Sequence, residues 1–311
     1  MLSRVAERLY WFARYVERTE NTARLLLVRH NLILDLPTSV QPGWDLLIDV
    51  MGVRESIAGA QVKSIEKNVV SFVFGDRENP SSIISSLAAA RENMRITREV
   101  MPSETWERIN SLYLSVARRG KKNLPRNSRH KVLNDIIQRC QQITGMLAGC
   151  MNHEDAYHFI RIGRNLERGD MSTRIIDVGS AHLLGADDEV LLYRNALWVS
   201  VLQSLSAYQM YRLNVRRKVR PDDVLEFLMR NPVFPRSLGH TLQEIEDSVS
   251  ALPLNVVPIK VIRSVKQKLK STEVSELRGN ALHEFIDELQ LQLGKIHHAI
   301  VSTWFQPHSV S

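Results

Sequence analysis

The chain has 311 residues, of which 44% are hydrophobic and 24% are charged, and its formal net charge is +7. This size and apolar content support a substantial buried core and exclude disordered, collagen-like and disulfide-rich classes. Cys140 and Cys150 lack metal-site spacing and are interpreted as buried thiols of a reducing compartment. Charges interrupt the N-terminal apolar residues, and no long apolar run follows, so we expect a cytoplasmic protein without a signal peptide or membrane span.

The positive charge is concentrated in one short segment. Seven Arg and Lys residues and no acid lie between Arg118 and Lys131, and their seven positive charges equal the net charge of the whole chain. Gly120 and Pro125 predict a solvated loop there. Nucleic-acid binding through this 118–131 loop is one alternative function, although a local excess is weak evidence for it. Two other basic runs, 212–220 and 260–270, are interpreted as solvated helix ends, with an acidic partner or nucleic acid as the alternative.

Apolar residues recur at steps of three and four along almost the whole chain, which predicts an all-α protein. Glycine and proline mark the breaks between helices, and Pro102 is expected to kink or split one of them. The predicted helices span residues 2–35, 43–63, 66–74, 81–118, 129–150, 153–178, 188–217, 221–230, 235–250, 258–271 and 278–305.

An internal repeat relates the first half of the chain to the second. A segment of the first predicted helix aligns without a gap to one 150 positions later, and four identical residues pair up: Arg14 with Arg164, Glu17 with Glu167, Arg18 with Arg168, and Arg24 with Arg174. Weaker matches follow in the same order. We therefore predict a tandem duplication of a helical unit of about 150 residues. The expected product is one bilobal helical bundle over residues 1–311, with repeats at about 1–152 and 153–311 that meet across one interface.

The repeated Glu–Arg helices are the candidate site. Arginine outnumbers lysine 30 to 11 in the chain, and arginine is favoured where a planar fork meets carboxylate or phosphate. Three interpretations stay open: a solvated face of weak ion pairs, buried pairs that lock the two halves together, or a polar site for an anionic ligand or an acidic group of a partner. Arg91 and Glu92 repeat the Arg–Glu step on another predicted helix.

Signatures of common catalytic and metal sites are absent from the sequence. No nucleotide-binding glycine loop, nucleophile elbow or HExxH motif occurs. Asp155 and His158 have the spacing of a di-iron motif, but the first half offers no matching histidine, and His297 and His298 have no partnering acid. We therefore predict no catalytic residue, no metal and no cofactor.

The chain resembles the bacterial Alpha-E family, which is named for its Glu-Arg motif. Four stretches carry the resemblance: MLSRVAERLYWFARYVERTENTARLL, ARENMR with SETWE, EDAYHFIRIGRNLERGDMSTRIID, and FLMRNPVFPRSL. The resemblance implies a helical cytoplasmic protein of unsettled biochemical activity, of a family typically encoded beside circularly permuted ATP-grasp ligases and transglutaminase-like proteins. The setting it implies is peptide or amide-bond formation, or peptide tagging. The resemblance places the motif at Glu17, Arg18, Glu167 and Arg168. Gly169 departs from the small Ala expected there, and Gly costs about 1 kcal/mol of helix propensity.

The resemblance therefore implies a non-catalytic or accessory helical protein that works with an ATP-grasp amide-bond-forming ligase in peptide synthesis or modification. It would bind an anionic small molecule, a peptide carboxylate or a partner. The residues assigned to that role are Arg14, Glu17, Arg18, Arg24, Arg91, Glu92, Arg164, Glu167, Arg168 and Arg174. The alternative enzyme would use Glu17 or Glu167 as a general base on an amine, which requires a pKa raised by burial.

Overall fold

The computed structural model describes residues 1–37, 41, 43–54, 65–120, 124–184 and 193–306. Over these residues it contains thirteen α-helices and no β-strand, so the all-α prediction is confirmed. None of the helices in these ranges is long and apolar enough to cross a membrane.

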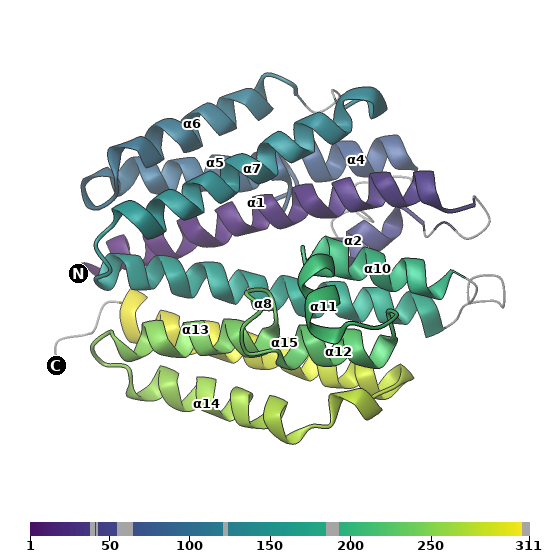
Figure 1. Ribbon diagram of the computed structural model, residues 1–311. Coiled ribbons are helices and arrows are strands. Elements are labelled where there is room, and N and C mark those ends of the chain that lie inside the picture. The colour runs from purple at the N-terminus through teal and green to yellow at the C-terminus, as the bar shows by residue number, and fades with distance from the viewer. Residues whose placement is uncertain (38–40, 42, 55–64, 121–123, 185–192, 307–311) are drawn as a thin grey trace.

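Two lobes stack on each other, as Figure 1 shows. The first lobe packs α5 (Ile83–Ile96), α6 (Ser103–Ala117) and α7 (Arg126–Cys150) around α1 (Ser3–Asp35), with α2 (Asp45–Met51) and α4 (Glu66–Gly75) at one end. The second lobe packs α13 (Leu238–Ser250), α14 (Val256–Ser271) and α15 (Gly279–Ile300) with α8 (Asp155–Leu184). Its remaining helices are α10 (Arg194–Ser204), α11 (Tyr208–Val215) and α12 (Pro221–Arg230).

The packing order is the same in both lobes. Helix α1 contacts α5 and α7, while α6 bridges α5 and α7; α8 contacts α13 and α15, while α14 bridges α13 and α15. The two corresponding helices α5 and α13 also start alike, because Ser82 accepts a hydrogen bond from the Ser85 amide and Ser237 accepts one from the His240 amide. This correspondence is the one that a duplication would produce, and common ancestry of the halves stays a prediction.

Most predicted helices end at the breaks that glycine and proline mark in the sequence. The helix predicted over 81–118 is split, because α5 ends at Ile96, a short 3₁₀ turn (Arg98–Val100) follows, and α6 starts directly after Pro102. The helix predicted over 43–63 is shorter, since Gly52 adopts φ +65° and ends α2; residues 55–64 lie outside the described ranges. The helix predicted over 188–217 breaks between Ser204 and Tyr208, and residues 185–192 also lie outside.

Two smaller expectations were wrong. Cys140 is buried, but Cys150 is exposed at the end of α7. The predicted 118–131 loop is partly helical, because α7 starts at Arg126; Lys121 and Lys122 lie outside the described residues. The nucleic-acid alternative loses support, because Arg126 and Arg129 both pair with Glu66 of α4 and the Arg129 side chain is only 4% exposed.

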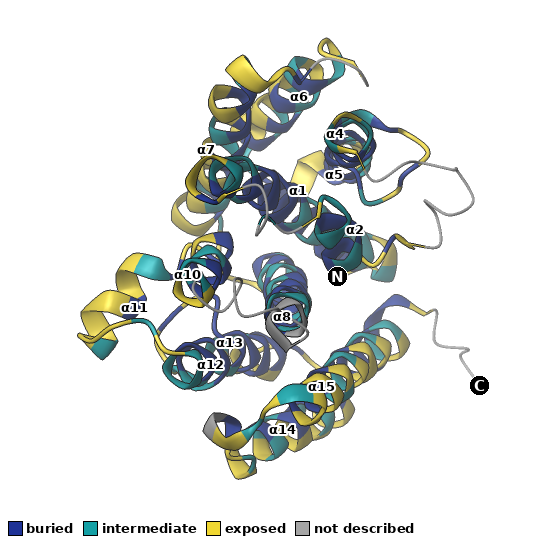
Figure 2. Ribbon diagram, turned by 90° about the vertical axis from the view of Figure 1, so that its right-hand side faces the viewer, coloured by how far each residue is buried: buried dark blue, intermediate teal, exposed yellow. Residues whose placement is uncertain are grey.

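The core centres on the contact between α1 and α8, which run side by side in the same direction through the middle of the molecule (Figure 1). Both helices are largely buried, whereas α14 and α11 expose much of their surface (Figure 2). The two central helices approach closely at Gly163, where an added Cβ would lie 2.2 Å from the carbonyl oxygen of Tyr10. A side chain at this position is therefore excluded by the backbone of α1.

We expect Gly163→Ala to destabilise the protein by about 1–3 kcal/mol, because the new methyl group forces α1 and α8 apart. Gly145→Ala is the matched control, since Gly145 lies in α7 with open space around its Cβ position. That control should gain about 0.5–1 kcal/mol from its better helix propensity. Urea unfolding measures both, and equal stabilities for the two variants would contradict the close approach.

Candidate functional site

Glu17 and Glu167, the glutamates of the repeated motif, lie inside the contact between α1 and α8. Each residue is only 1% exposed. The interpretation as a solvated outer face is therefore wrong for these two residues. An ionised carboxylate at this depth requires partners that replace its lost hydration, and arginines supply them in both cases.

Glu167 on α8 is held by two arginines of α1. Arg18 donates from Nε to Oε1 at 2.6 Å and from Nη2 to Oε2 at 3.0 Å, which is a bidentate pair. Arg14 donates from Nε to Oε2 at 2.8 Å. Burial alone would raise the pKa of Glu167, but the Arg14 and Arg18 charges outweigh it and lower this pKa to about 2.

Glu17 on α1 is held in the reciprocal way. Arg168 of α8 forms an ion pair with it, with Nε 3.0 Å from Oε2. Arg236, just before α13, donates from Nη1 to Oε1 at 2.7 Å. Burial opposes ionisation here too, yet Arg168 and Arg236 lower the pKa of Glu17 to about 2. Each motif glutamate therefore binds the motif arginine of the other helix, so the motifs join the two lobes.

Arg236 is a central residue that the sequence analysis did not assign to the site. Its side chain is buried, and it also donates to Asn21 Oδ1 at 2.7 Å and to Glu20 Oε1 at 2.8 Å. Arg24 binds the same two acceptors from within α1. The only sequence signal for Arg236 was its place in the FLMRNPVFPRSL stretch, because nothing local links it to a residue 219 positions earlier.

Arg164, the counterpart of Arg14 in the repeat, has a different environment. Its Nε is buried and has no hydrogen-bond partner. Burial and then the nearby Arg168 charge lower its pKa, although the Glu17 charge acts in the opposite direction. The central contact thus holds a cation that no carboxylate of the described residues pairs with directly.

The remaining three assigned residues lie outside this network. Arg174 pairs with Asp170 one turn before it on α8, with Nε 3.0 Å from Oδ2. Arg91 donates to Asn110 at 2.7 Å and stacks over Trp106. Glu92 is exposed and pairs with Arg95. The structure therefore brings together Arg14, Glu17, Arg18, Arg24, Arg164, Glu167 and Arg168, and it leaves Arg91, Glu92 and Arg174 on other contacts.

A hydrogen-bonded pair connects the network to α15. Tyr10 and His297 Nδ1 lie 2.7 Å apart, and Arg14 donates to the same Tyr10 oxygen at 3.3 Å. Burial raises the pKa of Tyr10 to about 12 and, with the Arg14 charge, lowers the pKa of His297 to about 4. At neutral pH the phenol therefore donates to a neutral imidazole. His297 has a structural partner here that its sequence neighbours did not reveal.

One group of side chains in the described ranges has metal-ligand geometry, and the sequence analysis missed it. Asp177, His283 and Asp287 offer ligand atoms within 4.8 Å of one another. His283 Nδ1 lies 2.7 Å from Asp177 and Nε2 lies 3.5 Å from Asp287, and the imidazole is half-exposed. Both ring nitrogens are thus engaged by carboxylates, and ion pairing accounts for the group without a metal.

The geometry counts against the enzyme alternative. A general base at Glu17 or Glu167 needs a pKa raised toward neutrality, whereas both pKa values are about 2. Each carboxylate is also held by two guanidinium groups. The arrangement can hold two lobes together and keep an unpaired guanidinium in place, but it cannot remove a proton from an amine.

We expect Glu167→Gln to lower the free energy of unfolding by about 3–5 kcal/mol at pH 7, because it leaves Arg14 and Arg18 without their buried partner. The folded-state pKa of about 2 lies below the ordinary value of 4.5. The carboxylate therefore stabilises the fold above about pH 4.5, and this contribution is lost as the pH falls toward 2.

Urea unfolding at pH 7 and at pH 3 measures both effects, and the stability gap between wild type and Glu167→Gln should narrow at the lower pH. Glu92→Gln is the control, because Glu92 is exposed and pairs only along its own helix surface. A Glu167→Gln variant as stable as Glu92→Gln would contradict the buried network.

Comparisons with known proteins agree with this geometry. The sequence model of a family described as a predicted alpha-helical domain with a conserved ER motif matches residues 1–305. An uncharacterised protein of Mycobacterium bovis and uncharacterised proteins of two Mycobacterium tuberculosis strains are each 22% identical over 320 residues. The match covers 94% of this chain but only 35% of each relative, so the chain spans about a third of their length. No solved structure matches the chain.

Proposed function

Because the chain belongs to the Alpha-E family, we propose that it is a non-catalytic accessory protein that works with an ATP-grasp amide-bond-forming ligase in peptide synthesis or modification. A transglutaminase-like protein is a second proposed partner. The length of the mycobacterial relatives supports an accessory role, since about two-thirds of each lies outside the match. In those proteins a segment similar to this chain shares its polypeptide with other sequence.

The main support for a non-catalytic role is the burial and ionisation of the two motif glutamates. Glu17 and Glu167 are buried, ionised and each bound to two arginines. A motif in this state serves the packing of α1 against α8 and gives a rigid frame on which other groups are positioned.

The excess of arginine over glutamate supports binding of an anion. Six arginines (Arg14, Arg18, Arg24, Arg164, Arg168 and Arg236) surround three glutamates (Glu17, Glu20 and Glu167) at the contact between the lobes. Two of them, Arg164 and Arg168, have a buried Nε without a hydrogen-bond partner. Arg168 still forms an ion pair with Glu17, whereas Arg164 pairs directly with no carboxylate of the described residues. A carboxylate or phosphate group of a peptide or an acyl-phosphate would satisfy it, because guanidinium binds both in the same geometry.

We expect Arg164→Gln to raise the free energy of unfolding by about 1 kcal/mol in buffer without multivalent anions, because it removes a partly buried, unpaired charge beside Arg168. Pyrophosphate and citrate should raise the melting temperature of the wild type and have little effect on the variant. Arg194→Gln is the matched control, since Arg194 is exposed on α10.

Melting curves with and without each anion make this measurement. If Arg164→Gln is less stable than the wild type, or if it responds to both anions as the wild type does, Arg164 is not the anion site. A response to pyrophosphate alone would assign phosphate, and a response to citrate alone would assign carboxylate.

Co-purification from the native host tests the partnership. A tagged wild-type chain should recover a protein with an ATP-grasp domain, identified by mass spectrometry after nuclease treatment. Arg194→Gln should recover it equally, and Arg164→Gln should lose it if the anionic group belongs to that partner. Recovery of no ATP-grasp protein by any form would contradict the proposed accessory role.

A further inference from the structure

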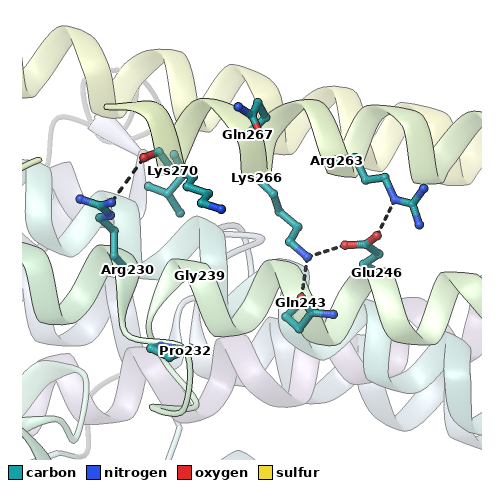
Figure 3. A pocket seen from close by; sticks show the side chains of 10 residues that line it. Arg230, Pro232, Gly239, Gln243, Glu246, Arg263, Lys266, Gln267 and Lys270 are labelled. Carbon is teal, nitrogen blue, oxygen red and sulfur yellow. Dashed lines mark hydrogen bonds and ion pairs between the residues drawn. The ribbon is translucent and has the colours of Figure 1, made fainter. Parts of the chain in front are cut away.

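The second lobe carries a strongly basic groove, about 740 Å³ in volume, between α13 and α14 (Figure 3). Four cations line it, namely Arg230, Arg263, Lys266 and Lys270, together with a single acid, Glu246. Helix α14 contains no Asp or Glu at all, although it holds five Lys and Arg residues. The groove therefore presents an excess of positive charge at the outer edge of the lobe, away from the contact between α1 and α8 (Figures 1 and 2).

Helix periodicity places these cations on one side of α14. Arg263, Lys266, Gln267 and Lys270 have the spacing i, i+3, i+4 and i+7, so their side chains share one face. Gly239, Gln243 and Glu246 lie opposite on α13 (Figure 3). The two helices thus form walls that are basic on one side and mostly polar on the other, with Leu269 as an apolar contact in the lining.

The cations of the groove already hold one carboxylate. Glu246 receives a hydrogen bond from Arg263 Nε at 2.7 Å and forms an ion pair with Lys266, so each of its oxygens has a different cation (Figure 3). Lys266 also donates to Gln243 Oε1 at 2.5 Å. Lys270 and Gln267 are exposed beyond this arrangement. At the other end of the groove Arg230 pairs with Glu226 and Glu273, which lie outside the lining, and Lys270 is exposed beside it. The groove is consequently organised around carboxylate, through surface ion pairs of the kind that a competing carboxylate can exchange.

We propose that this groove binds an acidic polypeptide segment of a partner. From Arg263 to Lys270 the helix rises about 10 Å, which matches about three residues of an extended peptide. Alternate side chains of such a peptide point to the same side about 7 Å apart, and the cations of α14 recur at a similar interval of about 4.5–6 Å. Gln243 and Gln267 supply amide groups that can bind a peptide backbone.

The lining favours a peptide over a nucleic acid. Single-stranded nucleic acids are bound by basic grooves whose aromatic side chains stack with the bases, and none of the ten lining residues is aromatic. Binding of an acidic segment adds to the proposed accessory role the chemistry by which the partner is contacted. It rests on that role only for the partner's identity.

The test uses a fluorescein-labelled peptide of five Ser-Glu repeats as the probe, with five Ser-Gln repeats as the uncharged control. Wild-type protein should bind the Ser-Glu peptide with an affinity that falls as salt is added, and it should not bind the Ser-Gln peptide. The variant Arg230→Gln/Arg263→Gln/Lys270→Gln should bind the Ser-Glu peptide about tenfold more weakly.

The matched control is Arg118→Gln/Arg119→Gln/Lys260→Gln, which removes the same charge from exposed positions outside the groove. Its affinity should stay within about twofold of the wild type, and melting curves should show that both variants are folded. Equal weakening in the two variants, or no binding by the wild type at low salt, would overturn the proposal. A hexanucleotide of equal charge that binds more tightly than the peptide would assign the groove to nucleic acid instead.

This measurement needs no ligase and leaves Arg164 unchanged, so its failure would be distinct from a failure of the proposed function. Absence of peptide binding by the wild type, with intact co-purification, would contradict the proposed role of the groove alone. Peptide binding without co-purification would contradict the ligase partnership and support the proposed role of the groove.

Discussion

The reciprocal exchange of buried Glu–Arg pairs between α1 and α8 is the interaction on which the rest of the structure depends. Glu17 binds an arginine of α8, and Glu167 binds arginines of α1. Removing charges from water is costly, and a pair of this kind stabilises a fold only when its hydrogen bonds are nearly complete. The bidentate contact of Arg18 and the added donor Arg14 meet that condition at Glu167. At Glu17, Arg236 donates to Oε1, while Arg168 faces Oε2 in an ion pair without a hydrogen bond. The contact thereby contributes to fixing one register between the two helices, together with the close approach at Gly163.

This network gives a physical reason for arginine and glutamate to occur together at the corresponding positions of α1 and α8. A buried carboxylate without its guanidinium partner, or the reverse, leaves an uncompensated charge in the core. The close backbone approach of the two helices lies one turn before Glu167, at Gly163, where the absence of a side chain permits it. Arg164 differs from the other arginines of the contact because it pairs with no carboxylate of the described residues, and a buried polar group without a partner, such as its Nε, marks a position where a ligand can supply the missing contact.

Much of the fold follows from local sequence patterns, whereas the site depends on contacts between distant segments. The boundaries of α1, α4 and α12 agree closely with the predicted helices, because apolar spacing and nearby Pro or Gly are local signals. The repeat also identified the Glu–Arg helices as the feature of interest. Burial of Glu17 could not be derived in this way, because a glutamate among arginines on a helix is usually solvated. The pairing of Arg126 and Arg129 with Glu66 could not be derived from local patterns either, because 60 residues or more separate the partners.

The most direct test of the buried Glu–Arg exchange between α1 and α8 is a double-mutant cycle on Arg18 and Glu167. It uses Arg18→Gln, Glu167→Gln and the double variant in urea unfolding. The exposed pair Arg95 and Glu92 provides the matched cycle, because it joins the same two residue types along one helix surface. The account predicts a coupling free energy of about 2 kcal/mol or more for Arg18 with Glu167, and at most about 0.5 kcal/mol for Arg95 with Glu92. Equal and small coupling in both cycles would contradict the claim that the Glu–Arg exchange holds the two lobes together.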